Sequence, residues 1–171
     1  MEFPPMQVTL RDGRSVTLRE VRPDDAAAFQ AALERLSADT LNSRFFSAIR
    51  PTHAMVERAV TPLAGRERAL VAIAGEGASI AGGGRCISGA DGESCEFAVM
   101  IADGWRGAGL ASTIMRALIR DARARGLKRM EGYVLTQNKS MLDLARRLHF
   151  EVGPSDEGPS VKLVRLDLAG R

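Results

Sequence analysis

The chain has 171 residues, of which 45% are apolar and 26% charged, the balance of an ordinary globular protein. Its formal net charge is only +3, which argues against a nucleic-acid partner. No apolar run reaches the roughly 18 residues of a membrane helix, and residues 1–12 lack the apolar core of a signal peptide. We therefore expect one domain over residues 1–171, in a cytoplasmic protein without a membrane partner.

The first half of the chain predicts four strands and two helices. A strand at 15–19 is followed by the turn Arg22-Pro23-Asp24-Asp25, which caps a helix over 26–36. Thr52 caps a second helix over 53–60. Apolar strands follow at 69–74, 79–88 and 93–101, the last two joined by the hairpin signal Gly89-Ala90-Asp91-Gly92. Three glycines at 82–84 are expected to weaken their strand.

The second half alternates helices and strands. A helix over 110–124, stopped by Gly126, precedes a strand at 129–136. Asn138 caps a helix over 141–148, and a surface loop at 153–158 leads to a last strand at 161–168. This mixed order predicts an α/β fold with a mixed sheet of about six to seven strands, flanked by about four helices.

One turn stands out between an expected strand and an expected helix, with the sequence Trp105-Arg106-Gly107-Ala108-Gly109-Leu110-Ala111. Its backbone N–H groups are unpaired and lie at the positive end of the helix dipole, which suits a pyrophosphate. Side chains in place of the glycines would hold a phosphate away from the backbone. The turn lacks the ending of a Walker P-loop and the three-glycine dinucleotide fingerprint. The sequence thus predicts a site for a phosphate-bearing ligand.

Other charged and sulfur-bearing residues leave alternatives open. Six basic residues follow the turn, either as a solvated helix face or as a contact to a ligand's outer phosphate: Arg116, Arg120, Arg123, Arg125, Lys128 and Arg129. Cys86 and Cys95 lie at equal distances from the hairpin tip and are expected to be free core thiols that face each other. No spacing typical of zinc ligands is present, so no metal site is expected.

The pattern Arg-x-x-Gly-x-Ala at 106–111, after a hairpin strand and before the helix-opening Asn138, resembles the GNAT family of N-acetyltransferases. The resemblance implies a GNAT fold with its core at about 15–168. Three segments resemble the GNAT domains of bacterial protein-lysine acetyltransferases in particular: Ser43-Arg44-Phe45-Phe46, Asn138-Lys139-Ser140-Met141 and Ala145-Arg146-Arg147-Leu148-His149-Phe150. Phe45 and Phe46 are expected in the core, with an acceptor channel as the alternative.

This resemblance implies acetyl-CoA as co-substrate and a set of binding residues. The pyrophosphate would bind Arg106 and the amides of Gly107, Ala108, Gly109, Leu110 and Ala111. The pantetheine arm would pair with the backbone of Val99, Met100 and Ile101 and contact Asn138. The implied acceptor is a primary amine, and a protein lysine is the favoured acceptor. A small amine is the alternative acceptor, and a non-catalytic CoA-binding module is the alternative to an enzyme. A homodimer is common among such folds.

Acyl transfer to an amine needs a base, a polariser of the thioester carbonyl and a proton for the leaving thiolate. Glu96 is the candidate base, because the related lysine acetyltransferases place a glutamate at this position and partial burial would raise its pKa. The alternative is an edge carboxylate paired with Arg85 across the hairpin. The backbone N–H near Met100 or Ile101 is the candidate polariser.

The general acid departs from the family pattern. Many members carry a tyrosine seven residues after the helix-opening asparagine, where this chain has Ala145. Tyr133 is a candidate acid, although a core tyrosine with a satisfied hydroxyl is the favoured interpretation, and water is the alternative proton source. His149 stands where a glycine is usual. Trp105 is expected to cover apolar surface beside the turn.

Overall fold

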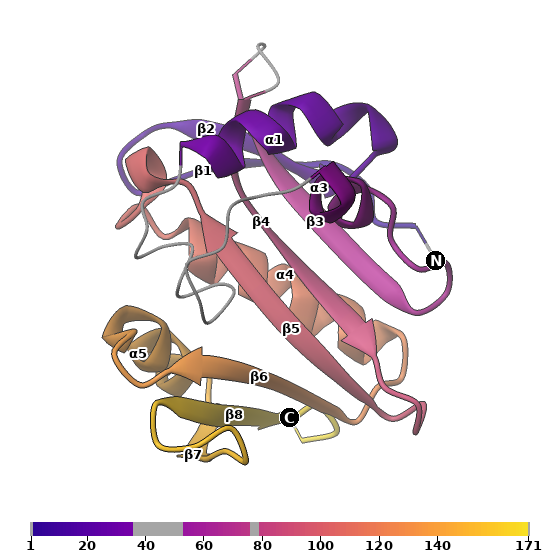
Figure 1. The fold of residues 1–171 in the computed structure, drawn as a ribbon, viewed down its shortest axis with the longest axis vertical. Helices are drawn as coiled ribbons and strands as arrows, with labels where there is room; N and C mark the ends of the chain where they lie inside the picture. The colour runs from indigo at the N-terminus through magenta and orange to yellow at the C-terminus, as the bar shows by residue number, and fades with distance from the viewer. Residues whose placement is uncertain (1, 36–52, 76–78, 171) are drawn as a thin grey trace.

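The computed structural model describes residues 2–35, 53–75 and 79–170. Its strands form one eight-stranded sheet in the order β1-β2-β3-β4-β5-β6-β8-β7 (Figure 1). Neighbouring strands are antiparallel, except that β5 and β6 run parallel. The strands are β1 Met6–Thr9, β2 Ser15–Glu20, β3 Glu67–Ala74, β4 Ser79–Ser88, β5 Ser94–Ile101, β6 Arg129–Leu135, β7 Glu151–Pro154 and β8 Val161–Asp167.

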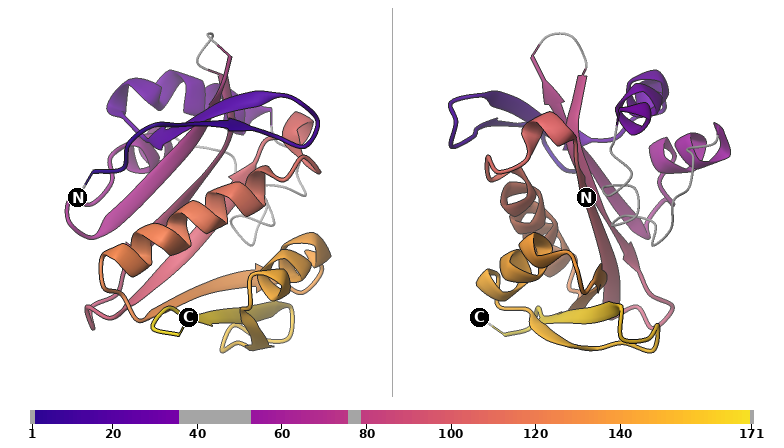
Figure 2. Two further views of the ribbon diagram at one scale, coloured as in Figure 1. Left: turned by 180° about the vertical axis from the view of Figure 1, so that it is seen from behind. Right: turned by 60° about the vertical axis from the view of Figure 1, so that its left-hand side comes forward.

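Helices cover both faces of this sheet. The described part of the chain contains α1 Ala26–Glu34, α3 His53–Val60, α4 Leu110–Ala124, α5 Lys139–Arg147 and the short 3-10 helices η1 Pro23–Asp25 and η2 Asp103–Trp105. Figure 2 shows the sheet between α4 and α5 on one side and α1 and α3 on the other. The larger hydrophobic core lies under α4 and α5, and a smaller one lies under α1 and α3. The predicted mixed α/β fold is confirmed.

The sheet has more strands than the sequence predicts. Strand β1 has only four residues, too few for a clear alternating pattern. Strand β7 includes Gly153 and Pro154, so the prediction that the loop begins at 153 is wrong. Both are edge strands, where short length and proline are tolerated because no further strand needs the missing N–H. Helix α5 begins at Lys139, two residues before the prediction, and Thr52 lies outside the described residues.

The glycines of β4 bring helix α4 close to the sheet. A Cβ at Gly84 would lie 2.5 Å from Cγ2 of Ile114 and 3.1 Å from Cδ1 of Leu118, both buried on α4. At Gly83 a Cβ would lie 2.9 Å from the carbonyl oxygen of Leu70 on β3. Strand β4 still pairs with a neighbour on each side. The glycines therefore serve close packing rather than weakening the strand.

Strands β5 and β6 pair over a short stretch and then diverge (Figure 1). The paired rungs run from Ser94–Arg129 to Glu96–Glu131. Beyond Glu96, β5 stays paired with β4, and β6 stays paired with β8. The sheet thus splits into two halves after the Glu96–Glu131 rung, and the edge of β5 that faces β6 carries unpaired backbone groups from there on.

Cys86 and Cys95 are buried free thiols, as predicted. They are not directly opposite, because Cys86 pairs with Phe97 and Cys95 with Ser88. Their positions make them diagonal neighbours on one face of the sheet. A hydrogen bond between the two thiols, together with burial, raises the pKa of Cys86 far above its ordinary value, so Cys86 remains a protonated core thiol.

Candidate active site

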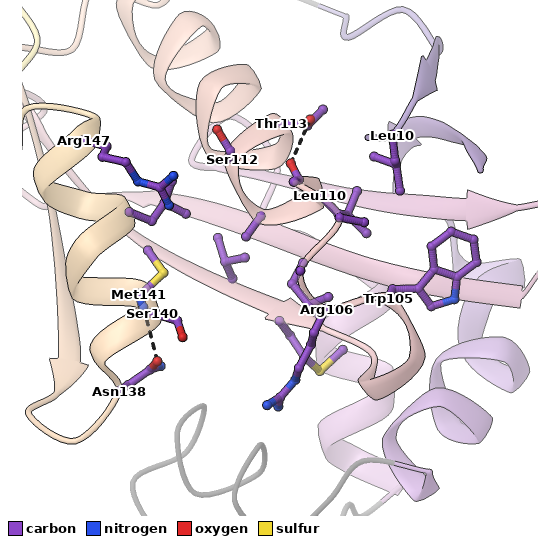
Figure 3. Close-up of a pocket in the computed structure, with 18 of the residues that line it drawn as sticks. Leu10, Trp105, Arg106, Leu110, Ser112, Thr113, Asn138, Ser140, Met141 and Arg147 are labelled. Atoms are coloured by element: carbon purple, nitrogen blue, oxygen red, sulfur yellow. Dashed lines mark hydrogen bonds between the residues drawn. The ribbon is translucent and has the colours of Figure 1, made fainter. Parts of the chain in front are cut away.

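A cavity of about 570 Å³ opens where β5 and β6 diverge (Figure 3). Its walls come from these two strands, the turn that follows β5, the first turn of α4, helix α5 and the β1–β2 turn. The cavity is lined by every residue that the sequence analysis assigns to the cofactor: Val99, Met100, Ile101, Arg106, Gly107, Ala108, Gly109, Leu110, Ala111 and Asn138. The fold therefore brings together residues from two segments that lie far apart in the sequence.

The turn before α4 has the backbone geometry of an anion site. Gly107 and Gly109 have φ angles of 77° and 88°, in the left-handed region that a residue with a side chain adopts only at a cost. Gly109 is the N-cap of α4, so the first N–H groups of the helix lack intrahelical acceptors and lie at its positive end. The turn with its two glycines therefore fits a pyrophosphate.

Helix α5 forms the opposite wall. The side-chain oxygen of Asn138 accepts a hydrogen bond from the backbone N–H of Met141 at 3.3 Å (Figure 3). This bond confirms the predicted cap and leaves the amide nitrogen of Asn138 as a donor toward a ligand. Arg147, near the end of the same helix, also lines the cavity and points from α5 toward α4 in Figure 3.

Glu96 lies at the point where the two strands separate, directly before the cavity residue Phe97. Its side chain is exposed, so the expectation that Glu96 is partly buried among apolar neighbours is wrong. The alternative pairing with Arg85 is also wrong. Arg85 lies opposite Ala98 and donates instead to the Glu67 carboxylate at 2.6 Å and to the carbonyl oxygen of Ala59 at 2.7 Å.

Tyr133 lines the cavity from β6 and is partly exposed. The expectation of a core tyrosine is therefore wrong. Desolvation raises the pKa of its hydroxyl, and the negative charges of four nearby carboxylates raise it further: Asp156, Glu96, Glu131 and Glu157. A raised pKa keeps the phenol protonated near neutral pH, which is the state that can donate a proton. Ala145, at the usual tyrosine position, is fully buried.

The end of β1 and the β1–β2 turn contribute residues that the sequence analysis missed. Thr9, Leu10 and Arg11 line the cavity, although they precede the glycine turn by roughly a hundred residues in sequence, so no local pattern connects them. The neighbouring Arg14 places its guanidinium 3.9 Å above the ring of Trp105 and donates to the carbonyl oxygen of Gly104 at 2.9 Å. Trp105 packs against the core beside the turn, as predicted.

The six basic residues after the turn do not line this cavity. Several are held by the protein itself: Arg123 by the carbonyl oxygen of Leu168, Arg125 by Asp121 and Ser88, and Lys128 by Glu93. The structure therefore favours a structural and solvated helix face over a ligand contact. Phe45 and Phe46 lie outside the described residues.

No group of three or more His, Cys, Asp or Glu side chains in residues 2–35, 53–75 and 79–170 is arranged to hold a metal ion. No helix in these same ranges combines the length and the hydropathy needed to span a membrane.

Comparison with known proteins agrees with this architecture. The family model for the acetyltransferase (GNAT) domain matches residues 15–151. An acetyltransferase of Pseudomonas aeruginosa is 31% identical over 159 residues, which cover 91% of this chain and 85% of the relative. The acetyltransferase Pat of Mycolicibacterium smegmatis is 30% identical over 145 residues, which cover 84% of this chain but only 44% of Pat.

Solved structures show the same fold. The GNAT domain of S. lividans PAT aligns with a TM-score of 0.87 at 24% identity, over 97% of this chain and 99% of that domain. RimL, a protein acetyltransferase solved in complex with coenzyme A, aligns with a TM-score of 0.73 at 15% identity, over 89% of this chain and 93% of RimL. The matched domain model and the relative of Pseudomonas aeruginosa identify the chain as an acetyltransferase. The chain belongs to the GNAT family of N-acetyltransferases, which use acetyl-CoA.

Proposed function

We propose that this protein transfers the acetyl group of acetyl-CoA to the side-chain amine of a protein lysine, with Glu96 as the general base. The observation that carries the proposal is the position of Glu96 on the last rung between β5 and β6, where the cofactor cavity begins. Acetyl-CoA supplies an activated thioester, and the residues around the split supply binding and proton transfer.

Two parts of the cavity support binding of the cofactor. The pyrophosphate fits the amides of Gly107, Gly109 and the first turn of α4, as argued from their backbone geometry. The pantetheine arm fits the edge of β5 over 99–101, because β6 no longer pairs with β5 there and the backbone groups of an open strand edge hydrogen-bond to amides. Asn138 offers a side-chain donor from the opposite wall.

The proposed chemistry divides the proton transfers between two residues. Glu96 accepts a proton from the lysine ammonium, directly or through water, and the resulting neutral amine attacks the thioester carbon. The backbone N–H near Met100 or Ile101 donates to the carbonyl oxygen as charge develops there. The C–S bond then breaks, and Tyr133, kept protonated by its raised pKa, donates its proton to the thiolate of CoA. The Tyr133 phenolate then regains a proton, through water, from the nitrogen of the new amide, so that the two protons lost by the lysine ammonium end on Glu96 and on the CoA thiol.

The acceptor approaches from the face of the sheet covered by α1 and α3. A second cavity of about 200 Å³ lies on that face and shares Ala98 and Met100 with the cofactor cavity. The carboxylates of Asp156, Glu96 and Glu157 near Tyr133 favour a cationic acceptor such as a lysine ammonium. The similarity to Pat and to the GNAT domain of PAT adds to the preference for a protein acceptor over a small amine.

The test measures acetylation of lysine peptides and of small primary amines by the wild type, Glu96→Gln and Glu131→Gln. Glu131 is the matched control because it lies opposite Glu96 but is held by Arg129 at 2.8 Å and Arg165 at 3.1 Å. We expect Glu96→Gln to lower kcat by roughly 10²–10⁴-fold with unchanged affinity for CoA, and Glu131→Gln to change kcat little.

Other outcomes separate the alternatives. Acetylation of small amines but of no lysine peptide would contradict the proposed protein acceptor, while the proposed acetyltransferase activity would stand. CoA binding without turnover on any amine would support a non-catalytic module. We further propose that residues 1–171 form a single domain and that the protein is cytoplasmic. We also propose that it forms a homodimer, and light scattering on the purified protein measures the oligomeric state.

A further inference from the structure

Arg11 lies against the glycine turn that holds the proposed pyrophosphate site. Its backbone N–H donates to the carbonyl oxygen of Ala108 at 3.2 Å, and its guanidinium donates to the carbonyl oxygen of Gly107 at 3.2 Å. A Cβ at Gly109 would lie 3.2 Å from Nε of Arg11. The guanidinium therefore lies beside the N-cap of α4, and Arg11 lines the cavity.

Among the described residues, the nearby arginines Arg14 and Arg106 lie close to carboxylates, whereas the guanidinium of Arg11 does not. Arg14 forms an ion pair with Asp12 at 2.6 Å, and Arg106 lies 3.6 Å from Asp103. In the part of the chain that the structure describes, Arg11 has no carboxylate within 4 Å. The positive end of a helix dipole disfavours a nearby cation unless an anion lies there too. An anion bound between the guanidinium and the helix would offset this unfavourable placement of Arg11.

We propose that Arg11 is a cofactor-binding residue that donates to the pyrophosphate of CoA from the β1–β2 turn. The proposal rests on the proposed function, since it adds a residue to the same cofactor site. One N–H of the guanidinium is used by Gly107, and four of the five that an arginine carries remain for phosphate oxygens. The β1–β2 turn then forms a third wall of the phosphate site, beside the glycine turn and the first turn of α4.

Calorimetric titration of the full chain with three probes tests this role. CoA and dephospho-CoA both contain the pyrophosphate, whereas pantetheine lacks it. We expect Arg11→Gln to weaken the binding of CoA and of dephospho-CoA by the same factor, about tenfold. The affinity for pantetheine should not change. Arg11→Lys keeps the charge and is expected to restore part of the loss.

Arg120→Gln is the matched control for net charge. Arg120 is exposed on α4, about 15 Å along the helix from its N-terminus, and we expect wild-type affinity. The dependence of CoA affinity on salt separates a direct contact from a structural one. Loss of an ion contact makes the affinity less sensitive to salt, whereas a distorted turn would lower affinity with the wild-type dependence.

Each result decides between the two proposals. If the wild type does not bind CoA, the proposed function fails, and this inference fails with it. If the wild type binds CoA and Arg11→Gln binds it equally well, only the inference on Arg11 is overturned. A loss for CoA but not for dephospho-CoA would assign Arg11 to the outer 3′-phosphate and contradict the pyrophosphate contact. A loss of CoA affinity that keeps the wild-type salt dependence would show that Arg11 only stabilises the turn and does not contact the phosphate.

Discussion

Glu96 of β5 and Glu131 of β6 lie opposite each other on the last rung that joins the two halves of the sheet. Because alternate residues of a strand share a face, Glu96 lies on the same face as Met100, which packs under α1 and α3 with Leu33 and Val56. Two arginines hold the half-buried carboxylate of Glu131, and the side chain of Glu96 is exposed beside the opening. Two carboxylates on one rung therefore have different environments, which is why one serves as a matched control for the other.

Gly109→Glu is expected to abolish binding of CoA. The side chain would bring bulk and negative charge to the N-cap of α4, where the pyrophosphate is proposed to bind, and the φ angle of 88° adds strain. Gly104→Glu is the control, because Gly104 lies outside the cavity lining and has open space around it. Calorimetry on both variants, with circular dichroism to check folding, measures the effect. Retained CoA affinity in a folded Gly109→Glu would contradict the cofactor site.

Tyr133→Phe is expected to lower kcat by about 10²-fold, with the affinity for CoA unchanged, because the leaving thiolate loses its proton donor. The raised pKa of Tyr133 lies above the ordinary value of 10.0. The acid form therefore persists through the range below that value, and the wild-type rate should not fall between about pH 8 and pH 10 through this group. A full pH–rate profile of both proteins tests this. Equal rates for the two would remove Tyr133 from the mechanism and favour water as the acid.

His149→Gly is expected to stabilise the protein by about 1 kcal/mol. His149 follows the C-cap residue Leu148 of α5 and has a φ angle of 71°. Its N–H donates to the carbonyl oxygen of Arg146, and the N–H of Phe150 donates to that of Ala145. This bonding is a Schellman motif, whose left-handed residue is usually glycine. Urea unfolding measures the gain. His149→Ala keeps the strained conformation, so an equal gain there would contradict the explanation.

Asp91→Ala is expected to lower the melting temperature at pH 7 but not at acid pH. Backbone N–H groups of Ser94 and Glu93 hold the pKa of Asp91 down to about 2. A depressed pKa means that the stabilisation is fully present above the ordinary value of 3.8 and is lost as the pH falls through about 2. Thermal melts of both proteins from pH 7 downward should therefore converge toward pH 2. A constant difference over this range would show that the ionised carboxylate is not responsible.

Much of the local structure could be predicted from the sequence. The helices that became α3 and α4 have the predicted bounds, and the hairpin before β5 and the cap by Asn138 are where their motifs place them. These features depend on neighbouring residues, through hydrophobic periodicity, capping oxygens and turn glycines. The glycine turn belongs to the same class, because its two left-handed residues lie in one short segment.

Most of the helices and strands, the glycine turn and the family resemblance follow from the sequence alone, because each depends on residues close together in the chain. The three-dimensional fold was needed to show where β5 and β6 part, that Glu96 is exposed, that Tyr133 lines the cavity, and that Arg11 lies against the glycine turn. These relationships join segments distant in sequence, and strand register and packing set them. No local pattern contains that information, since the same side chain is buried or exposed according to what the rest of the fold places against it.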